Sequence, residues 1–157
     1  MPAFIEETGF RQVILNLVIN AKDAIERNGK IKISLKKVEK GKPIMKNAVG
    51  EKQIAPCTGA ELSLKDNGEG IPADLKERLF EPFVTTKASS SGSGFGLYNT
   101  KIFIEDHNGL IGFSSTEGKG TTFFLFIPLE SDEEEKLAKR VKRAKRATRA
   151  FIKTTKK

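Results

Sequence analysis

Two asparagines one helical turn apart are the first residues in this chain that could do chemistry. Asn16 and Asn20 lie in QVILNLVINAKDAI, where apolar residues recur every three or four positions. Residues four apart in a helix share one face. A carboxamide oxygen on that face could ligate Mg²⁺ beside phosphate groups. It could equally bond a neighbouring loop, because half-buried asparagines need hydrogen-bond partners, and the spacing alone leaves both interpretations open.

A second candidate is the aspartate of KDNGEGIP. Asp66 ends a predicted strand and is followed closely by Gly68 and Gly70. Glycines let a flat ring approach the backbone, and a carboxylate at that point could accept a hydrogen bond from the exocyclic amine of adenine. An ordinary turn is the alternative, since Asn-Gly is a common turn signal.

A third candidate is the glycine-rich stretch GSGFG. Gly92, Gly94 and Gly96 precede a predicted helix over 96–107. Backbone N–H groups at a helix start can bind an anion, and the helix dipole favours it. Such a stretch could also be a flexible linker. The nearby TTK at 85–87 and the apolar helix that follows argue against a linker.

The elements that would position these residues mix helices and strands. We expect helices over 10–28, from Pro72 through ADLKERLF, and over 96–107, and strands over 31–38, 61–66, 110–115 and 121–128. Thr8 is the expected N-cap of the first helix, and 39–59 and 81–95 are expected to be loops. The pattern predicts an α+β fold, a two-layer sandwich with a mixed, mostly antiparallel sheet and helices on one face. A Rossmann fold is excluded, because no strand leads directly into a glycine-rich helix start.

The order of these motifs is more specific than any one of them. NLVINAKDAI, DNGEGIP, LFEPFVTTK, GSGFGL and GKGTTF follow one another along the chain. Together they strongly resemble the ATP-binding catalytic domain of sensor histidine kinases. That domain belongs to the GHKL superfamily with DNA gyrase, the MutL mismatch-repair proteins and the ninety-kilodalton heat-shock chaperone. The resemblance covers about residues 2–129 and implies a Bergerat-type fold that binds ATP and Mg²⁺.

The resemblance also implies roles for particular residues. Asn20 would ligate Mg²⁺, Asn16 and Lys87 would lie close to the phosphates, and these three form the implied catalytic set. Asp66 would accept from the adenine amine, and Lys22 would reach a phosphate. The remaining implied nucleotide-binding positions are Gly68, Gly70 and Thr121 around the base, Phe80 and Phe83 as anchors of a mobile lid, and Gly92, Gly94, Phe95, Gly96 and Leu97 in the lid motif, where Phe95 replaces the usual Leu.

Asn16 bears on the type of reaction. Gyrase-like members of the superfamily carry a glutamate at this position, which activates water, and asparagine cannot accept a proton at neutral pH. We therefore expect slow ATP hydrolysis and transfer of the γ-phosphate to an external nucleophile. The only histidine, His107, precedes Asn108-Gly109 at a helix end and is expected to be structural. The expected partners are then a histidine phosphoacceptor domain and a response regulator of a two-component system. The alternatives are a Ser/Thr kinase of the anti-sigma-factor type and a non-catalytic nucleotide-binding interaction module.

The charge of the chain is unevenly distributed. The net charge is +8, but residues 136–157 hold eleven Lys and Arg and no acid, which leaves 17 basic and 20 acidic residues in 1–135. We expect an ATP-binding domain over 1–129 and a charged helical tail over 130–157. The tail carries an amphipathic stripe at Leu137, Val141, Ala144, Thr148 and Phe151. It could dock weakly on the body or contact an acidic partner, whereas base-specific DNA reading is not expected because it lacks Asn and Gln.

Two further expectations concern location and completeness. A single cysteine and the absence of a signal sequence or a long apolar run indicate a cytoplasmic protein, including the cytoplasmic part of a membrane sensor. The first strand usual in the family has no room before the first helix. The sheet would then have an exposed edge, which a dimer partner or the tail could cover.

Overall fold

The computed structural model describes residues 5–26, 28–46, 52–84 and 94–129. Its helices are α1 (Glu7–Asp23) and α2 (Gly96–Asp106), with a 3₁₀ turn η1 (Ala73–Leu75). Its strands are β1 (Ile31–Val38), β2 (Pro43–Lys46), β3 (Lys52–Ile54), β4 (Gly59–Asp66), β5 (Leu110–Thr116) and β6 (Gly120–Pro128). The predicted tail helix, Lys87 and Gly92 lie outside the described residues.

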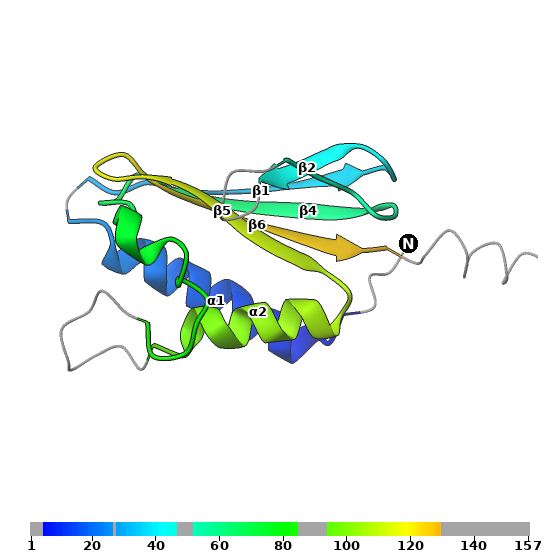
Figure 1. The fold of residues 1–157 in the computed structure, drawn as a ribbon, viewed down its shortest axis with the longest axis horizontal. Helices are drawn as coiled ribbons and strands as arrows, with labels where there is room; N and C mark the ends of the chain where they lie inside the picture. The colour runs from blue at the N-terminus through cyan, green and yellow to red at the C-terminus, as the bar shows by residue number, and fades with distance from the viewer. Residues whose placement is uncertain (1–4, 27, 47–51, 85–93, 130–157) are drawn as a thin grey trace, which may run out of the picture.

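The fold has two layers, one of sheet and one of helix. Strands β1, β4, β6 and β5 form one sheet in that order, and each described pairing is antiparallel. Helices α1 and α2 lie side by side on one face of this sheet (Figure 1). Leu17 and Ile104 from the helices pack with Leu64 and Leu125 from the strands, all four with no exposed surface. The predicted α+β two-layer sandwich is confirmed. None of the helices in the described ranges is long and apolar enough to cross a bilayer.

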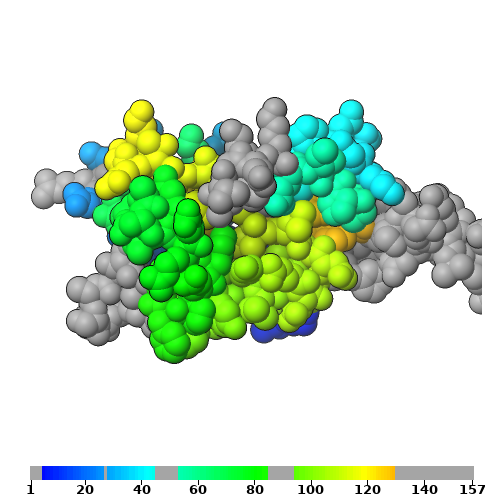
Figure 2. All heavy atoms as spheres, in the orientation of Figure 1, coloured from blue at the N-terminus to red at the C-terminus, as the bar shows by residue number. Residues whose placement is uncertain are grey.

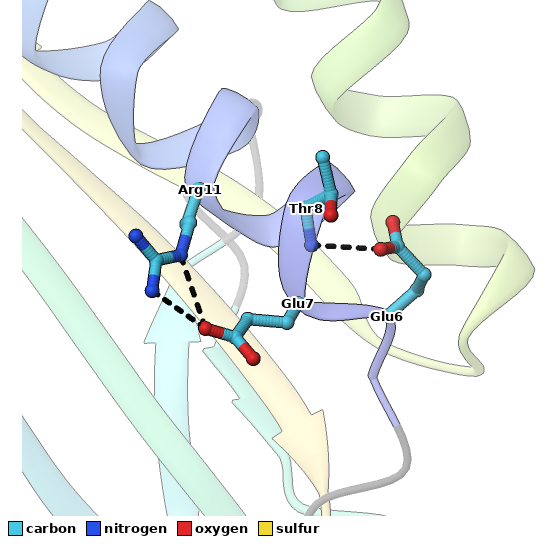
Figure 3. Close-up of polar contacts among 4 residues, drawn as sticks. All are labelled: Glu6, Glu7, Thr8 and Arg11. Carbon is cyan, nitrogen blue, oxygen red and sulfur yellow. Dashed lines mark hydrogen bonds and ion pairs between the residues drawn. The ribbon is translucent and has the colours of Figure 1, made fainter.

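The first helix begins earlier than predicted and is capped by a different residue. α1 runs from Glu7 to Asp23 rather than over 10–28, and Glu6, not Thr8, is the N-cap. The Glu6 carboxylate accepts a hydrogen bond from the backbone N–H of Thr8 at 2.7 Å (Figure 3). It also accepts one from the backbone N–H of Gly9. These two amides lower the pKa of Glu6. The first N–H groups of a helix have no partner inside the helix, and the Glu6 carboxylate accepts from two of them. The cap is therefore Glu6, and Thr8 lies inside the first turn.

His107 joins the start of α1 to the end of α2. Its Nδ1 lies 2.8 Å from the carbonyl oxygen of Phe103, and its Nε2 lies 3.3 Å from the backbone nitrogen of Glu6. Because the Glu6 N–H can only donate, Nε2 accepts and Nδ1 carries the proton that Phe103 receives. Both ring nitrogens are therefore used within the fold, and the predicted structural role of His107 is confirmed.

Two local predictions were wrong. The expected loop over 39–59 contains β2 and β3, a two-stranded antiparallel sheet. Ile44 of this hairpin packs with Val38 and Phe126 on the sheet face away from the helices, and the hairpin is seen in cyan in Figure 2. Strands of four and three residues are too short to show a period in the sequence. The expected helix after Pro72 is reduced to the three-residue turn η1.

The loop after β4 is held between the end of α1 and the β5–β6 turn. The N–H of Glu69 donates to the Ala24 carbonyl at 2.9 Å, and its carbonyl accepts from Gly118 at 2.6 Å. A Cβ at Gly68 would lie 2.4 Å from the Ala24 carbonyl oxygen. A Cβ at Gly70, where φ is +77°, would lie 2.4 Å from the Thr116 carbonyl oxygen. The loop can therefore take this path only with glycine at both positions.

We expect Gly70→Ala to destabilise the protein more than Gly118→Ala does. Both glycines have positive φ, +77° and +73°, but a Cβ at Gly118 meets nothing within 4 Å. Gly118→Ala should cost only the left-handed backbone penalty, about 1 kcal/mol, whereas Gly70→Ala adds a backbone clash. Urea unfolding of the two variants measures the difference. Equal losses of unfolding free energy would show that the loop does not press against β5.

Candidate functional site

The buried carboxylate of Asp66 is the centre of the candidate site. Asp66 ends β4 and is 2% exposed. Its Oδ1 accepts hydrogen bonds from the N–H of Gly68, at 2.9 Å, and from the N–H of Thr121, at 3.1 Å. The second carboxylate oxygen, Oδ2, receives no hydrogen bond from the described residues. One oxygen is thus fixed by the fold, while the other keeps its capacity to accept a hydrogen bond.

Ser115 supports this carboxylate from β5, although the sequence did not mark it. Its Oγ accepts from the N–H of Ile71 at 2.8 Å, and lies 3.2 Å from the Gly120 carbonyl and 2.9 Å from Thr121 Oγ1. A serine hydroxyl has one proton to donate. Ser115 uses this proton to donate a hydrogen bond to the Gly120 carbonyl, so the Thr121 hydroxyl donates to Ser115. The lone pairs of the Thr121 hydroxyl oxygen can then accept a hydrogen bond from another group. Ser115 has no motif around it, because its role comes from the pairing of β5 with β6.

Asn16 and Asn20 have different surroundings on α1. Asn16 donates from Nδ2 to the Gly96 carbonyl at 3.4 Å, and its Oδ1 accepts from Gln12 at 2.9 Å. Asn16 therefore ties α1 to the start of α2, and its proposed place beside the phosphates stays a prediction. The half-buried Asn20 side chain makes no hydrogen bond with the other described residues. Its carboxamide oxygen has no hydrogen-bond donor among the described residues and could ligate a metal ion.

The segment 85–93 leaves and re-enters the described fold at neighbouring points. A Cβ at Gly94, where φ is +70°, would lie 2.6 Å from the Phe83 Cα. The Phe83 ring meets the Phe95 ring edge-on, with centroids 4.7 Å apart, and Phe95 meets Tyr98 at 6.3 Å. Phe83 is 73% exposed and has φ +66°. These aromatic residues form the root of the predicted lid, and Tyr98 was not anticipated from the sequence.

The other predicted residues divide between core and surface. Phe80 packs edge-on against Phe113, with ring centroids 5.9 Å apart, and Leu97 packs against the same core. Lys22 is exposed in the last turn of α1. In Figure 2 the segment that follows β4, in green, lies against the start of α2. Of the two phenylalanines predicted to anchor the lid, Phe80 is packed against the core and Phe83 is exposed.

Helix α1 connects the two halves of the site. Its end at Ala24 contacts the Gly68 loop, and Asn16 bonds the start of α2. Eight helical residues separate these contacts, which corresponds to about 12 Å along the axis. The loop after Asp66 and the start of α2 are thus attached to the end and to the middle of one helix.

Comparison with known families matches residues 5–131 to the histidine kinase-, DNA gyrase B-, and HSP90-like ATPases. Sensor kinase CckA of Brucella abortus is 34% identical over 125 residues, which are 80% of this chain and 13% of that protein. Sensor histidine kinase ZraS of Escherichia coli K12 is 37% identical over 118 residues, 75% of this chain and 21% of that protein. The chain therefore spans only a small part of these relatives.

The similar solved structures also include histidine kinases. The catalytic domain of histidine kinase ThkA, in a nucleotide-free form, is 34% identical with a TM-score of 0.59, over 79% of this chain and 68% of that one. The mycobacterial sensor histidine kinase MprB shares the fold at 23% identity, with a TM-score of 0.62 over 80% of this chain and 76% of that one. The chain belongs to the histidine kinase-, DNA gyrase B- and HSP90-like ATPase family, as a catalytic domain of the sensor histidine kinase type.

Proposed function

We propose that this chain binds Mg-ATP and donates the γ-phosphate to a histidine on a separate phosphoacceptor domain, as part of a two-component sensor kinase. The observation that carries the proposal is Asp66, a buried carboxylate with one oxygen held by two backbone amides and the other left to accept. A buried anion of this kind is costly unless it is hydrogen-bonded. The retained second oxygen is therefore best explained by a ligand that donates to it.

The donor that fits is the exocyclic amine of adenine. Glycine at positions 68 and 70 means that the loop after Asp66 carries no side chain at these two positions. The Thr121 hydroxyl lies beside the carboxylate and can join through water. A flat base that donates to a carboxylate and accepts from ordered water matches this set of groups.

The part of the proposed site that would hold the phosphate groups lies along α1, toward the start of α2. Asn20 supplies a hard oxygen ligand for Mg²⁺, which takes oxygen ligands and keeps substrate phosphates in its coordination shell. Gly94 and Gly96, with Gly92, offer backbone N–H groups at a helix start, where anions are favoured. Lys22, two residues after Asn20, would add positive charge near the phosphates, as would Lys87. When bound, Mg²⁺ would neutralise developing charge on the phosphates, and the remaining residues would position them.

Replacing the adenine acceptor tests the base assignment. Asp66→Asn keeps an oxygen for Gly68 and Thr121 but puts an NH₂ group where the second oxygen was. That group repels the adenine amine and can donate to the 6-oxo group of hypoxanthine. We expect ATP affinity to fall at least tenfold and the ratio of ITP to ATP affinity to rise.

Calorimetric titration with both nucleotides measures these affinities, and Asp106→Ala at the far end of α2 is the matched control for loss of one carboxylate. Unchanged ATP affinity in Asp66→Asn, with the fold intact by circular dichroism, would show that the adenine assignment is wrong.

The metal ligand is tested by comparing titrations with and without Mg²⁺. Asn20→Ala removes the proposed Mg²⁺ ligand but no hydrogen bond between the described residues. We expect its ATP affinity to match wild type in EDTA and to fall below wild type when Mg²⁺ is present. An equal loss in both conditions would mean that Asn20 supports the fold or contacts the nucleotide directly.

Asn16 favours transfer over hydrolysis. Its side chain holds the Gly96 carbonyl through an N–H that a carboxylate lacks, so Asn16→Glu should disturb the start of α2. We expect hydrolysis by Asn16→Glu to rise far less than the roughly 10²–10⁴-fold that a positioned general base provides. Phosphate release from γ-labelled ATP measures this, and rapid hydrolysis by the unaccompanied wild-type chain would contradict the proposal.

The same labelled ATP identifies the acceptor. Mixing the chain with a histidine phosphoacceptor domain should label that domain with an acid-labile phosphoramidate, and a histidine-to-glutamine variant of the domain should stay unlabelled. Acid-stable label on serine would support the Ser/Thr kinase alternative, and binding without transfer would support the interaction module. A response regulator would then receive the phosphate, and these steps belong to the cytoplasmic part of a sensor.

A further inference from the structure

An apolar stripe on β1 lies on the helix side of the sheet but is not covered. Ile31, Ile33 and Leu35 are 38%, 50% and 69% exposed. They pair with Asp66, Leu64 and Leu62 of β4, two of which belong to the main core. Residues directly opposite in an antiparallel pair point to the same side. These three residues, the β1 stripe, therefore continue the core-facing surface beyond the edge of the helix layer, and exposure increases from Ile31 to Leu35.

The alternation on β1 makes a second copy of the chain a poor cover. β1 has β4 as its one neighbour in the described sheet, so its other edge could pair with β1 of another copy. Antiparallel pairing centred on Ser34 would set Lys32 directly opposite Lys36 of the second copy, and like charges in that position are destabilising. Such pairing would also extend the sheet and leave the stripe exposed.

The chain itself continues close to the end of β1. The N–H of Leu129, the last described residue, donates to the Thr58 carbonyl at 3.1 Å. Pro128 and Val38 both pair with Gly59, from opposite sides. Two strand spacings, about 10 Å, therefore separate the start of the tail from the end of β1. Residues 130–135 can extend about 20 Å, which is enough to reach it.

The charges at this end match the first part of the tail. Lys36, Lys37 and Lys42 line an open hollow of about 380 Å³ where β1 ends, together with one acidic residue, Glu39. Lys36 is paired with Glu61 at 2.9 Å, so Lys37 and Lys42 supply the positive charge available to a further segment. The tail begins with five acidic residues, Glu130, Asp132, Glu133, Glu134 and Glu135. Opposite charges over this short separation attract and limit the directions in which the chain can continue.

We propose that the tail folds back over the domain, with its acidic start at the lysine-lined hollow and residues 136–151 as a helix on the β1 stripe. The stripe of the tail, from Leu137 to Thr148, spans eleven residues, or about 16 Å in a helix. The β1 stripe, from Leu35 back to Ile31, spans about 14 Å. The eight basic side chains of 136–151 then flank the stripe and keep their charges in water.

Paramagnetic broadening in the full chain tests this placement. At 17.3 kDa the protein suits amide NMR, and Cys57→Ala leaves a single label site at Ala147→Cys, beside the tail stripe but not on it. A nitroxide there should broaden the amides of β1 strongly and those of β5, the opposite edge of the sheet, weakly. Uniformly sharp β1 signals in the oxidised sample would overturn the proposal.

Two identical substitutions separate docking from general effects on the tail. Ala144→Asp puts a charge on the tail stripe, whereas Ala150→Asp puts the same charge on the opposite side of the same helix. We expect Ala144→Asp to remove the β1 broadening and Ala150→Asp to keep it. Equal effects of the two variants would contradict the docked helix.

A mixed sample distinguishes the chain's own tail from that of a second copy. Isotope-labelled chains without nitroxide are mixed with spin-labelled chains that carry no isotope. Sharp β1 signals in the mixture support docking within one chain. Broadened β1 signals in the mixture would mean that the tail reaches another copy, and the proposal would be wrong.

Discussion

The hydrogen bonds to Asp66 Oδ1 are the interaction on which the rest of the site depends. A carboxylate that is 2% exposed must regain the hydrogen bonds it loses to water. Here the donors are backbone amides from two separate segments, Gly68 just after β4 and Thr121 at the start of β6. The buried charge therefore fixes the end of β4, the following loop and the β5–β6 turn relative to one another.

Helix α1 connects this part of the site to the start of α2. It contacts the Asp66 loop at one end and the start of α2 through Asn16, and its N-terminus is held by His107 through the Glu6 N–H. A helix with attachments at its start, middle and end cannot rotate or slide independently. The position of Asn20 between the last two attachments is thus set by contacts that Asn20 does not make itself.

The features that the sequence predicted well are local ones. Asp66 is observed at the end of β4 as predicted, and the strand over 31–38 is observed with the same bounds. The glycine predicted at the turn, Gly70, has the positive φ that favours this residue. Ser115 and Glu6 could not be identified this way. Ser115 accepts from Ile71, which is 44 positions away, and reaches Gly120 and Thr121 through the pairing of β5 with β6. The hydrogen bonds of Glu6 depend on where the first helix begins. The functional assignments of all the site residues remain predictions, and two of these residues, Lys87 and Gly92, lie outside the described residues.

The alternating apolar residues of IKISLKK on β1 are not buried by the described part of the fold. Such alternation is typical of a strand with one buried face, yet seven of its eight residues are exposed. α1 extends over β4 and only the near side of β1, so Leu35 is the most exposed of the three apolar residues. Because Leu35 is 69% exposed, the described contacts do not require an apolar side chain at this position. An apolar residue there, in phase with the core, fits a surface that a further segment covers.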